Sequence, residues 1–173
     1  AYGTEISKYF VSARVVNKKG EEKTLTKSDI QFFYRKSTFS KDDLLIEAKL
    51  KYKKGDIKKI EKMKKKFSDS RKNNQPLKFR SAGSIFKNPS TEVAAGYLID
   101  KAGLKGLKKG NAMISPKHAN FIVNLGKASS DDVLYLIRYI KREIAKEYKI
   151  LLELEIKLIG FSENEIQGLG CHA

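Results

Sequence analysis

The sequence has few of the residues that usually carry covalent or metal chemistry. Its 173 residues include one cysteine, two histidines and no tryptophan. Cys171 cannot form an internal disulfide, which fits a reducing cytoplasm. Because Cys171 and His172 are adjacent, their spacing is poor for a metal site, and we interpret them as a frayed tail. The P-loop, nucleophile-elbow, zinc-peptidase and dinucleotide-fingerprint motifs are absent, and His118 and His172 offer little material for a catalytic triad.

Long apolar runs are missing as well. No stretch approaches the roughly 18 apolar residues of a membrane-spanning helix, so we expect no membrane span. The sequence opens without a charged-then-apolar leader, so we expect no signal peptide. A hydrophobic content of 40% is enough for a packed core, in one domain or two small ones.

Acidic residues are outnumbered, 20 against 36 basic ones, which gives a net charge of +16. This charge makes nucleic acid the first partner to consider. However, 30 of the basic residues are lysines, whereas base and phosphate recognition favours arginine. The lysines are densest at KKIEKMKKK (58–66), on the polar side of an expected helix. We favour a solvated lysine-rich surface without a specific partner. Attraction of an anionic small-molecule substrate lies between this interpretation and nucleic-acid binding, and the charge alone does not choose among the three.

Hydrophobic periodicity divides the first half into strands and one helix. Residues 10–26 are predicted to form two strands around a turn at Asn17–Gly20, and residues 26–37 a short helical turn or loop. Alternation from Ile46 onward predicts a half-buried strand. Asp56 is expected to cap an amphipathic helix over 57–72. The NNQP stretch then suggests a boundary between domains 1–73 and 74–173.

The second half has the pattern of an α+β unit. A helix is expected over 90–103, with a Ser/Thr cap and a terminal Gly103. Residues 111–115 and 120–126 are typical of short buried strands. Ser129 and Asp132 form a cap pair for a helix that reaches residue 149. Its expected buried stripe consists of Val133, Ile137, Ile140, Ile144 and Tyr148. Residues 151–161 alternate between apolar and charged side chains, which predicts a final strand.

Several polar residues stand in apolar or turn settings and are candidates for chemistry. Arg35 follows three aromatic residues, Ser84 follows Gly83 in a turn, and Glu155 and Lys157 lie two residues apart on the last predicted strand. Each also has a purely structural explanation: a cation packed on rings, a turn serine, and an exposed pair of little energetic value. When each of these candidates is considered singly, we prefer the structural explanation. We likewise interpret His118 as a satisfied loop residue.

Taken together, these residues resemble a known family. The segments AYGTEI, FFYRKSTF, SAGSIFKNP, AAGYLIDKAGLKG, ISPKHANFIVNLGKASSDDV and LELEIKLIG are similar, in order and spacing, to the C-terminal portion of UDP-N-acetylenolpyruvoylglucosamine reductase. The resemblance covers residues 1 to about 161. It implies part of a flavin-binding module (1–73) followed by a two-layer α+β substrate-binding domain (74–173). It also implies a cytoplasmic bacterial enzyme of peptidoglycan precursor synthesis that uses FAD and NADPH.

The resemblance assigns roles to three residues. Ser84 would deliver a proton to C2 of the enolpyruvyl ether, Arg35 would hold and polarise the substrate carboxylate, and Glu155 would assist. Further positions match where the family contacts substrate or flavin, namely Asn88, His118, Asn120, Lys157 and Tyr34 for the UDP-sugar substrate and Tyr2 for the flavin.

The match also departs from the complete family pattern. The glycine-rich segments that hold the FAD pyrophosphate are expected upstream of Ala1. The 49 positions from Arg35 to Ser84 leave no room for the extra tyrosine-bearing loop of one subtype, which implies the shorter subtype. We expect a monomer that binds no membrane, no metal and no specific nucleic acid, and the alternative is a basic module for nucleic acid or an acidic partner.

Overall fold

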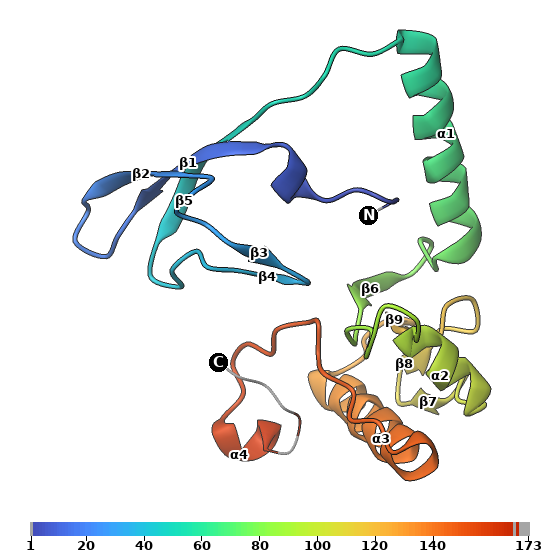
Figure 1. Cartoon of the computed structure of the whole chain (residues 1–173). Coiled ribbons are helices and arrows are strands. Elements are labelled where there is room, and N and C mark those ends of the chain that lie inside the picture. Colours follow the sequence, from blue (N-terminus) through green and yellow to red (C-terminus); the bar gives the residue numbers. More distant parts are fainter. Residues whose placement is uncertain (1, 168, 170–173) are drawn as a thin grey trace. The chain divides into compact units, whose positions relative to one another are not determined.

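The chain divides into two units, residues 1–67 and 68–173, each of which is described on its own (Figure 1). The computed structural model describes residues 2–167 and 169, so Cys171 and His172 lie outside the described residues. The division falls inside a helix, earlier than the boundary expected after residue 73. The last turns of that helix associate with the second unit, where Lys117 Nζ donates to the carbonyl oxygen of Lys72 at 2.6 Å. Within the described ranges, no helix is long and apolar enough to cross a membrane.

The first unit is built on a three-stranded antiparallel sheet. Its strands are β1 (Phe10–Val16), β2 (Glu22–Thr26) and β5 (Leu44–Leu50), in the order β2-β1-β5. A short 3-10 turn, η1 (Ile6–Lys8), precedes β1. The first two strands confirm the predicted hairpin, and the Asn17 side chain stabilises its turn by accepting hydrogen bonds from the backbone N–H groups of Lys19 and Glu21.

The aromatic segment of this unit forms a second hairpin, so the expected helical turn or loop is wrong there. Strands β3 (Phe32–Phe33) and β4 (Lys36–Ser37) pair antiparallel. The Phe32 ring packs edge-on against the rings of Phe10, at 5.3 Å between centroids, and Phe39, at 6.3 Å. Burial of aromatic surface therefore fixes an extended conformation at Phe32.

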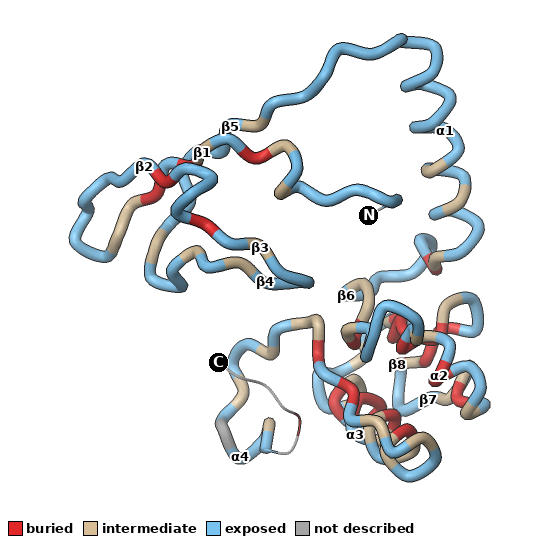
Figure 2. Tube along the Cα trace, viewed as in Figure 1, coloured by how far each residue is buried: buried red, intermediate tan, exposed pale blue. Residues whose placement is uncertain are grey.

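Two predicted amphipathic elements form as expected but are not buried. Helix α1 (Ile57–Asn74) begins at the predicted cap, because Asp56 Oδ1 accepts from the backbone N–H of Lys59 at 2.8 Å. Its apolar stripe is nevertheless exposed to solvent, since Ile60 is 51% exposed, and in β5 Ile46 is 45% exposed. Figure 2 shows α1 as exposed along most of its length. The half-buried assignment of β5 is therefore wrong. The small core of this unit gathers around β1, whereas β5 is an edge strand.

The second unit is a two-layer α+β fold, as the sequence predicts. Its antiparallel sheet has the order β6-β9-β8-β7, from strands β6 (Arg80–Ser84), β7 (Lys108–Lys109), β8 (Ala112–Ile114) and β9 (Phe121–Asn124). Helix α3 (Ser130–Tyr148) packs on β7 and β8, helix α2 (Ala95–Lys101) packs on α3, and a short α4 (Glu163–Ile166) follows. The core lies between the helices and the sheet and includes Ile99, Ile114 and Ile137.

The predicted N-terminal cap is present at helix α3 and absent at helix α2. The predicted Ser129–Asp132 capping box is present at α3, and three members of its predicted stripe, Ile137, Ile140 and Ile144, are buried. Helix α2 starts only at Ala95, later than expected, and has no side-chain cap on Ala94. Ser90 instead accepts from the backbone N–H groups of residues 92 and 93, in a turn that precedes the helix.

The predicted last strand is reduced to one isolated bridge, between Phe86 and Leu154. The expected alternation is nevertheless visible, since Leu152 and Leu154 are buried and Glu153 between them is exposed. The pairing partner ends quickly because Pro89 follows Asn88, and proline has no N–H to continue a ladder. The segment is therefore extended without forming a longer strand.

Candidate functional site

Ser84 was predicted to lie in a turn, but it is the last residue of strand β6, beyond the point where β6 departs from regular pairing with β9; this irregular strand end and residues 85–87 are called the Ser84 turn below. The register of the two strands shifts between Ser81 and Ser84, and Gly83 has φ +85°, a conformation that favours glycine. Ser84 is half-buried and lies opposite Phe121, while the next two side chains, Ile85 and Phe86, are each only 1% exposed. The apolar pair thus anchors a turn whose serine sits at the edge of the core.

Asn120 holds this turn through its side chain. Asn120 Oδ1 accepts from the backbone N–H of Phe86 at 2.9 Å, and Asn120 Nδ2 donates to the carbonyl oxygen of the same residue at 2.8 Å. The Asn120 backbone carbonyl also accepts from the N–H of Ile85 at 2.9 Å. With the residue only 4% exposed, this amide is buried and hydrogen-bonded at both ends.

Glu155 reaches the turn from the opposite edge. Its backbone N–H donates to the carbonyl oxygen of Ile85 at 2.8 Å, and the N–H of Lys87 donates to the carbonyl oxygen of Glu153 at 2.9 Å. The Lys87 ammonium and the Glu153 carboxylate also form an ion pair at 3.0 Å. Residues 85–87 are therefore bonded on both edges, by Asn120 on one side and by residues 153–155 on the other.

His118 lies in the loop before β9 and packs between two elements. Its ring meets Phe121 edge-on at 4.7 Å, and a Cβ built on Gly96 of α2 would lie 3.3 Å from its Cε1. Its Nδ1 is buried and has no hydrogen-bond partner among the residues that the structure describes, so the interpretation of His118 as a satisfied loop residue is wrong for this atom. Burial, with a contribution from the Lys105 cation, lowers the pKa of His118 below its ordinary value. The neutral form of the ring is therefore favoured in the folded state.

The other predicted substrate residues of this unit are near the surface. Asn88 is exposed, and its Oδ1 accepts from the backbone N–H of Ala95 at 3.2 Å, so it bonds the first turn of α2. Lys157 is exposed in residues 151–161, the predicted last strand, which is called the closing segment below. Both lie in sequence beside the paired segments 85–87 and 153–155.

The first unit carries the remaining three candidates. Tyr34 and Arg35 are the two central residues of the β3–β4 hairpin, and the Arg35 guanidinium lies 5.4 Å from the centre of the Tyr34 ring. Arg35 has φ 56°, which costs a non-glycine residue about 1 kcal/mol and is a frequent feature of functional positions. Tyr2 lies elsewhere in this unit, stacked on Phe67 at 4.1 Å between ring centroids.

The structure thus places Asn120 and Glu155 in contact with residues 85 and 86, which directly follow Ser84 in the second unit, and it brings Tyr34 and Arg35 together in the first. Gly96 is a contributor that the sequence reasoning missed. Its added Cβ would lie 3.5 Å from the Asn120 Cβ and 3.3 Å from His118. The available signal was a glycine inside a helical pattern, which often marks a close approach.

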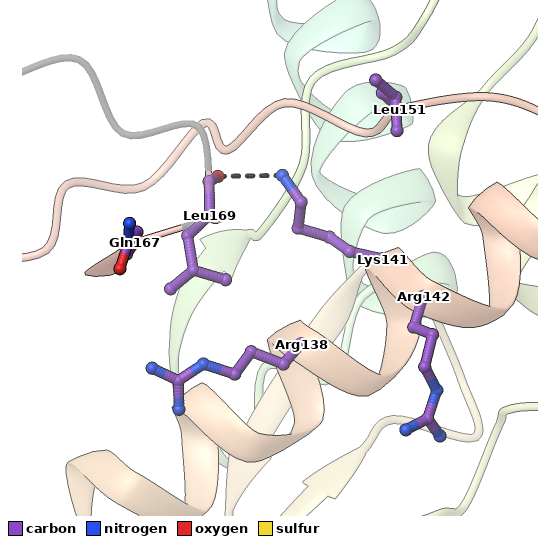
Figure 3. Close-up of a pocket in the computed structure, with 6 residues that line it drawn as sticks. All are labelled: Arg138, Lys141, Arg142, Leu151, Gln167 and Leu169. Atoms are coloured by element: carbon purple, nitrogen blue, oxygen red, sulfur yellow. Dashed lines mark hydrogen bonds between the residues drawn. The ribbon is translucent and has the colours of Figure 1, made fainter. Parts of the chain in front are cut away.

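A separate pocket opens beside α3 and shares no lining residue with the predicted site (Figure 3). Its volume is about 280 Å³, and Lys141 Nζ donates to the carbonyl oxygens of Leu152 and Leu169, each at 2.8 Å. The pocket is lined by Arg138, Lys141, Arg142, Leu151, Gln167 and Leu169.

The described residues contain no cluster of three metal-ligating side chains.

These contacts define an α+β domain that presents a serine, a glutamate and a buried amide around one strand end. Residues 75–159 match the family described as "UDP-N-acetylenolpyruvoylglucosamine reductase, C-terminal domain". This part of the chain is therefore similar to the C-terminal domain of that family, as the sequence segments suggested.

Curated relatives extend the match to nearly the whole chain. A UDP-N-acetylenolpyruvoylglucosamine reductase from Bacillus pumilus is 42% identical over 162 residues, which cover 92% of this chain and 53% of the relative. One from Chloroherpeton thalassium is 43% identical over 173 residues, covering 95% of this chain and 55% of the relative. The chain thus spans about half the length of the relatives it matches.

A solved structure of a protein with the same description is also similar to this chain. The crystal structure of UDP-N-acetylenolpyruvylglucosamine reductase from Thermus caldophilus superimposes with a TM-score of 0.75 at 37% sequence identity. The match covers 87% of this chain and 53% of that one. None of these matches supports the alternative of a basic nucleic-acid-binding module.

Proposed function

We propose that this chain supplies the substrate-binding half of an NADPH- and FAD-dependent reductase. The substrate would be the enolpyruvyl ether of UDP-N-acetylglucosamine, and the product UDP-N-acetylmuramate. The observation that carries the proposal is the pairing of residues 85–87 with 153–155, which brings Glu155 across from the residue after Ser84. The family match supports the substrate and the reaction.

The flavin, when bound, would supply a hydride to C3 of the enolpyruvyl group. This chain offers few groups to hold it: Tyr2 is 49% exposed and presents a tyrosine ring backed by Phe67, which suits contact with a planar ring system. We assign Tyr2 to that contact. The segments that would bind the FAD pyrophosphate are expected in the half of the relatives that this chain does not span.

Ser84 is the group that we assign to proton delivery at C2. A serine hydroxyl is a weak acid, so its alkoxide needs a nearby cation to be stabilised. Lys87, three residues after Ser84, and Lys157, two residues beyond the paired segment 153–155, are the candidate cations, and Lys87 is already paired with Glu153. The half-buried position of Ser84, beside buried Ile85 and Phe86, would limit access of water to the transferred proton.

Arg35 and Glu155 complete the proposed acid-base and binding set. Arg35 would bind the substrate carboxylate and stabilise the negative charge that develops there, which suits a guanidinium at an exposed hairpin tip. Glu155 would assist proton transfer, and Tyr34, Asn88, His118 and Lys157 would contact the UDP-sugar.

The test uses the complete protein that carries this sequence and measures the two half-reactions by stopped-flow. Flavin reduction by NADPH does not involve the enolpyruvyl group, so Ser84→Ala is expected to leave it near normal. Reoxidation by the substrate is expected to slow by about two to four orders of magnitude, the usual contribution of a general acid. Ser84→Cys, whose thiol can donate a proton, should retain more activity. Equal slowing of both half-reactions, or of neither, contradicts the assignment.

A further inference from the structure

Asn120 is well placed to determine the spacing between Ser84 and Glu155. Strand β9 pairs with β6 as far as Phe121 opposite Ser84. Beyond that point, the Asn120 side chain continues the ladder by one step, because its amide supplies both an acceptor and a donor to the backbone of Phe86. A primary amide has the same donor and acceptor types as a peptide group and can substitute for one.

Phe86 is also the residue that pairs with the closing segment. It bridges to Leu154, and its two neighbours bond to Glu153 and Glu155. The backbone of Phe86 is therefore bonded to Asn120, while the flanking residues are bonded to the Glu155 segment. A change at Asn120 would shift the turn that carries Ser84 and the register of Glu155 together.

The buried position of Asn120 argues against a direct contact with substrate. The residue is 4% exposed, and both ends of its amide are engaged by Phe86 at 2.9 and 2.8 Å. On its other side, Gly96 allows α2 to approach closely, since a Cβ there would lie 3.5 Å from the Asn120 Cβ. A ligand would have to displace two buried hydrogen bonds to reach the amide, which is unfavourable.

We propose that Asn120 is a positioning residue that holds the Ser84 turn and the Glu155 segment in register, and not a substrate ligand. The proposal rests on the proposed function for its catalytic consequence, but the contact itself can be tested without any activity. Asn124 provides a matched control, because it lies at the other end of β9 from Asn120 and its Oδ1 accepts from the backbone N–H groups of Gly126 and Ala128.

The first measurement is amide hydrogen exchange at Phe86 in the 173-residue chain. Asn120→Ala removes the acceptor, so the Phe86 amide is expected to exchange at least about tenfold faster relative to Leu136 in α3. Asn124→Ala is expected to leave that ratio unchanged. If Asn120→Ala does not fold, Asn120→Asp keeps the shape and the acceptor but loses the donor, and a smaller acceleration is expected. Unchanged exchange at Phe86 in a folded variant overturns the proposal, whatever the enzyme does.

The second measurement uses the complete protein and separates positioning from binding. Asn120→Ala is expected to slow substrate-dependent flavin reoxidation by about 10- to 100-fold, with KM for the UDP-sugar within about threefold of the parent value. Asn124→Ala should change neither. A raised KM with an unchanged reoxidation rate makes Asn120 a substrate contact and overturns the positioning role. A failure of the proposed function itself would show separately, as an absence of any effect of Ser84→Ala.

Discussion

Gly96→Ala tests the close approach of α2 to the loop that carries His118 and Asn120. In an isolated helix this change is favourable by up to about 1 kcal/mol, because glycine is a poor helix former. Here the new methyl group would lie 3.3 Å from His118 Cε1, closer than ordinary van der Waals contact, and 3.5 Å from the Asn120 Cβ. The His118 ring cannot yield easily, since Phe121 backs it at 4.7 Å.

The magnitude follows from the competition between these two effects. Extra methyl groups in a well-packed site cost about 1–3 kcal/mol. We therefore expect Gly96→Ala to lower the free energy of unfolding by about 0.5–2 kcal/mol. In a His118→Ala background the tight contact is gone, and the same substitution should be neutral or stabilising by up to about 1 kcal/mol.

The assay is urea denaturation of the four proteins of this double-mutant cycle. Far-UV circular dichroism reports the transition, since the sequence has no tryptophan. Amide exchange at Ile99 of α2 and Ile137 of α3 restricts the comparison to the second unit. The reasoning is refuted if Gly96→Ala stabilises the parent chain, or if its cost is the same in both backgrounds.

Three further outcomes are expected. Gly110→Ala should destabilise the second unit by about 1–3 kcal/mol in the same denaturation assay, because its Cβ would overlap the Asp132 carboxylate at φ +51°, and a neutral result would contradict this packing. Burial lowers the pKa of His118 in the folded state, so the unfolded state binds more protons as the pH falls through about 6.5, and the free energy of unfolding should decline below that pH. A pH series of urea midpoints should show this decline, and a less steep one in His118→Gln. Amide exchange should be fast across residues 10–55 and slow across 130–148, because the first unit has only a small core cluster, whereas uniform protection would refute this difference.

The elements that the sequence predicted well are those with strong local signals. Helix α3 has a capping box and a long apolar stripe, and both are visible in the sequence and present in the structure. The α1 cap at Asp56 and the turn at Asn17 were equally local. The α+β character of the second unit followed from these elements and their order.

Predictions of burial were weaker because periodicity does not reveal what covers an apolar face. The stripe of α1 and the face of β5 were predicted from spacing alone, yet Ile60 and Ile46 are about half exposed. The closing segment shows the converse case. Its alternating burial was predicted correctly as far as Leu154, but Glu155 and Ile156 are both partly buried, and its pairing depends on residues 85–87, which are far away in sequence.

The candidate site was only partly readable from the sequence. The positions of Ser84 and Glu155 came from the family resemblance, and no local pattern shows that Glu155 bonds to Ile85. The contact between Asn120 and Phe86 joins residues 34 positions apart. Such contacts depend on tertiary structure, so the sequence could name Asn120 but could not distinguish a ligand from a positioning residue.

The most direct test of the central claim is the mass of the product formed by the complete protein that carries this sequence. Incubated with NADPH and the enolpyruvyl ether of UDP-N-acetylglucosamine, it should oxidise the NADPH and convert the substrate into a product heavier by two hydrogen atoms, one added at C2 and one at C3. Ser84→Ala should form this product about two to four orders of magnitude more slowly once the flavin is reduced. If NADPH oxidation does not depend on the UDP-sugar, or the substrate mass is unchanged, the account is contradicted.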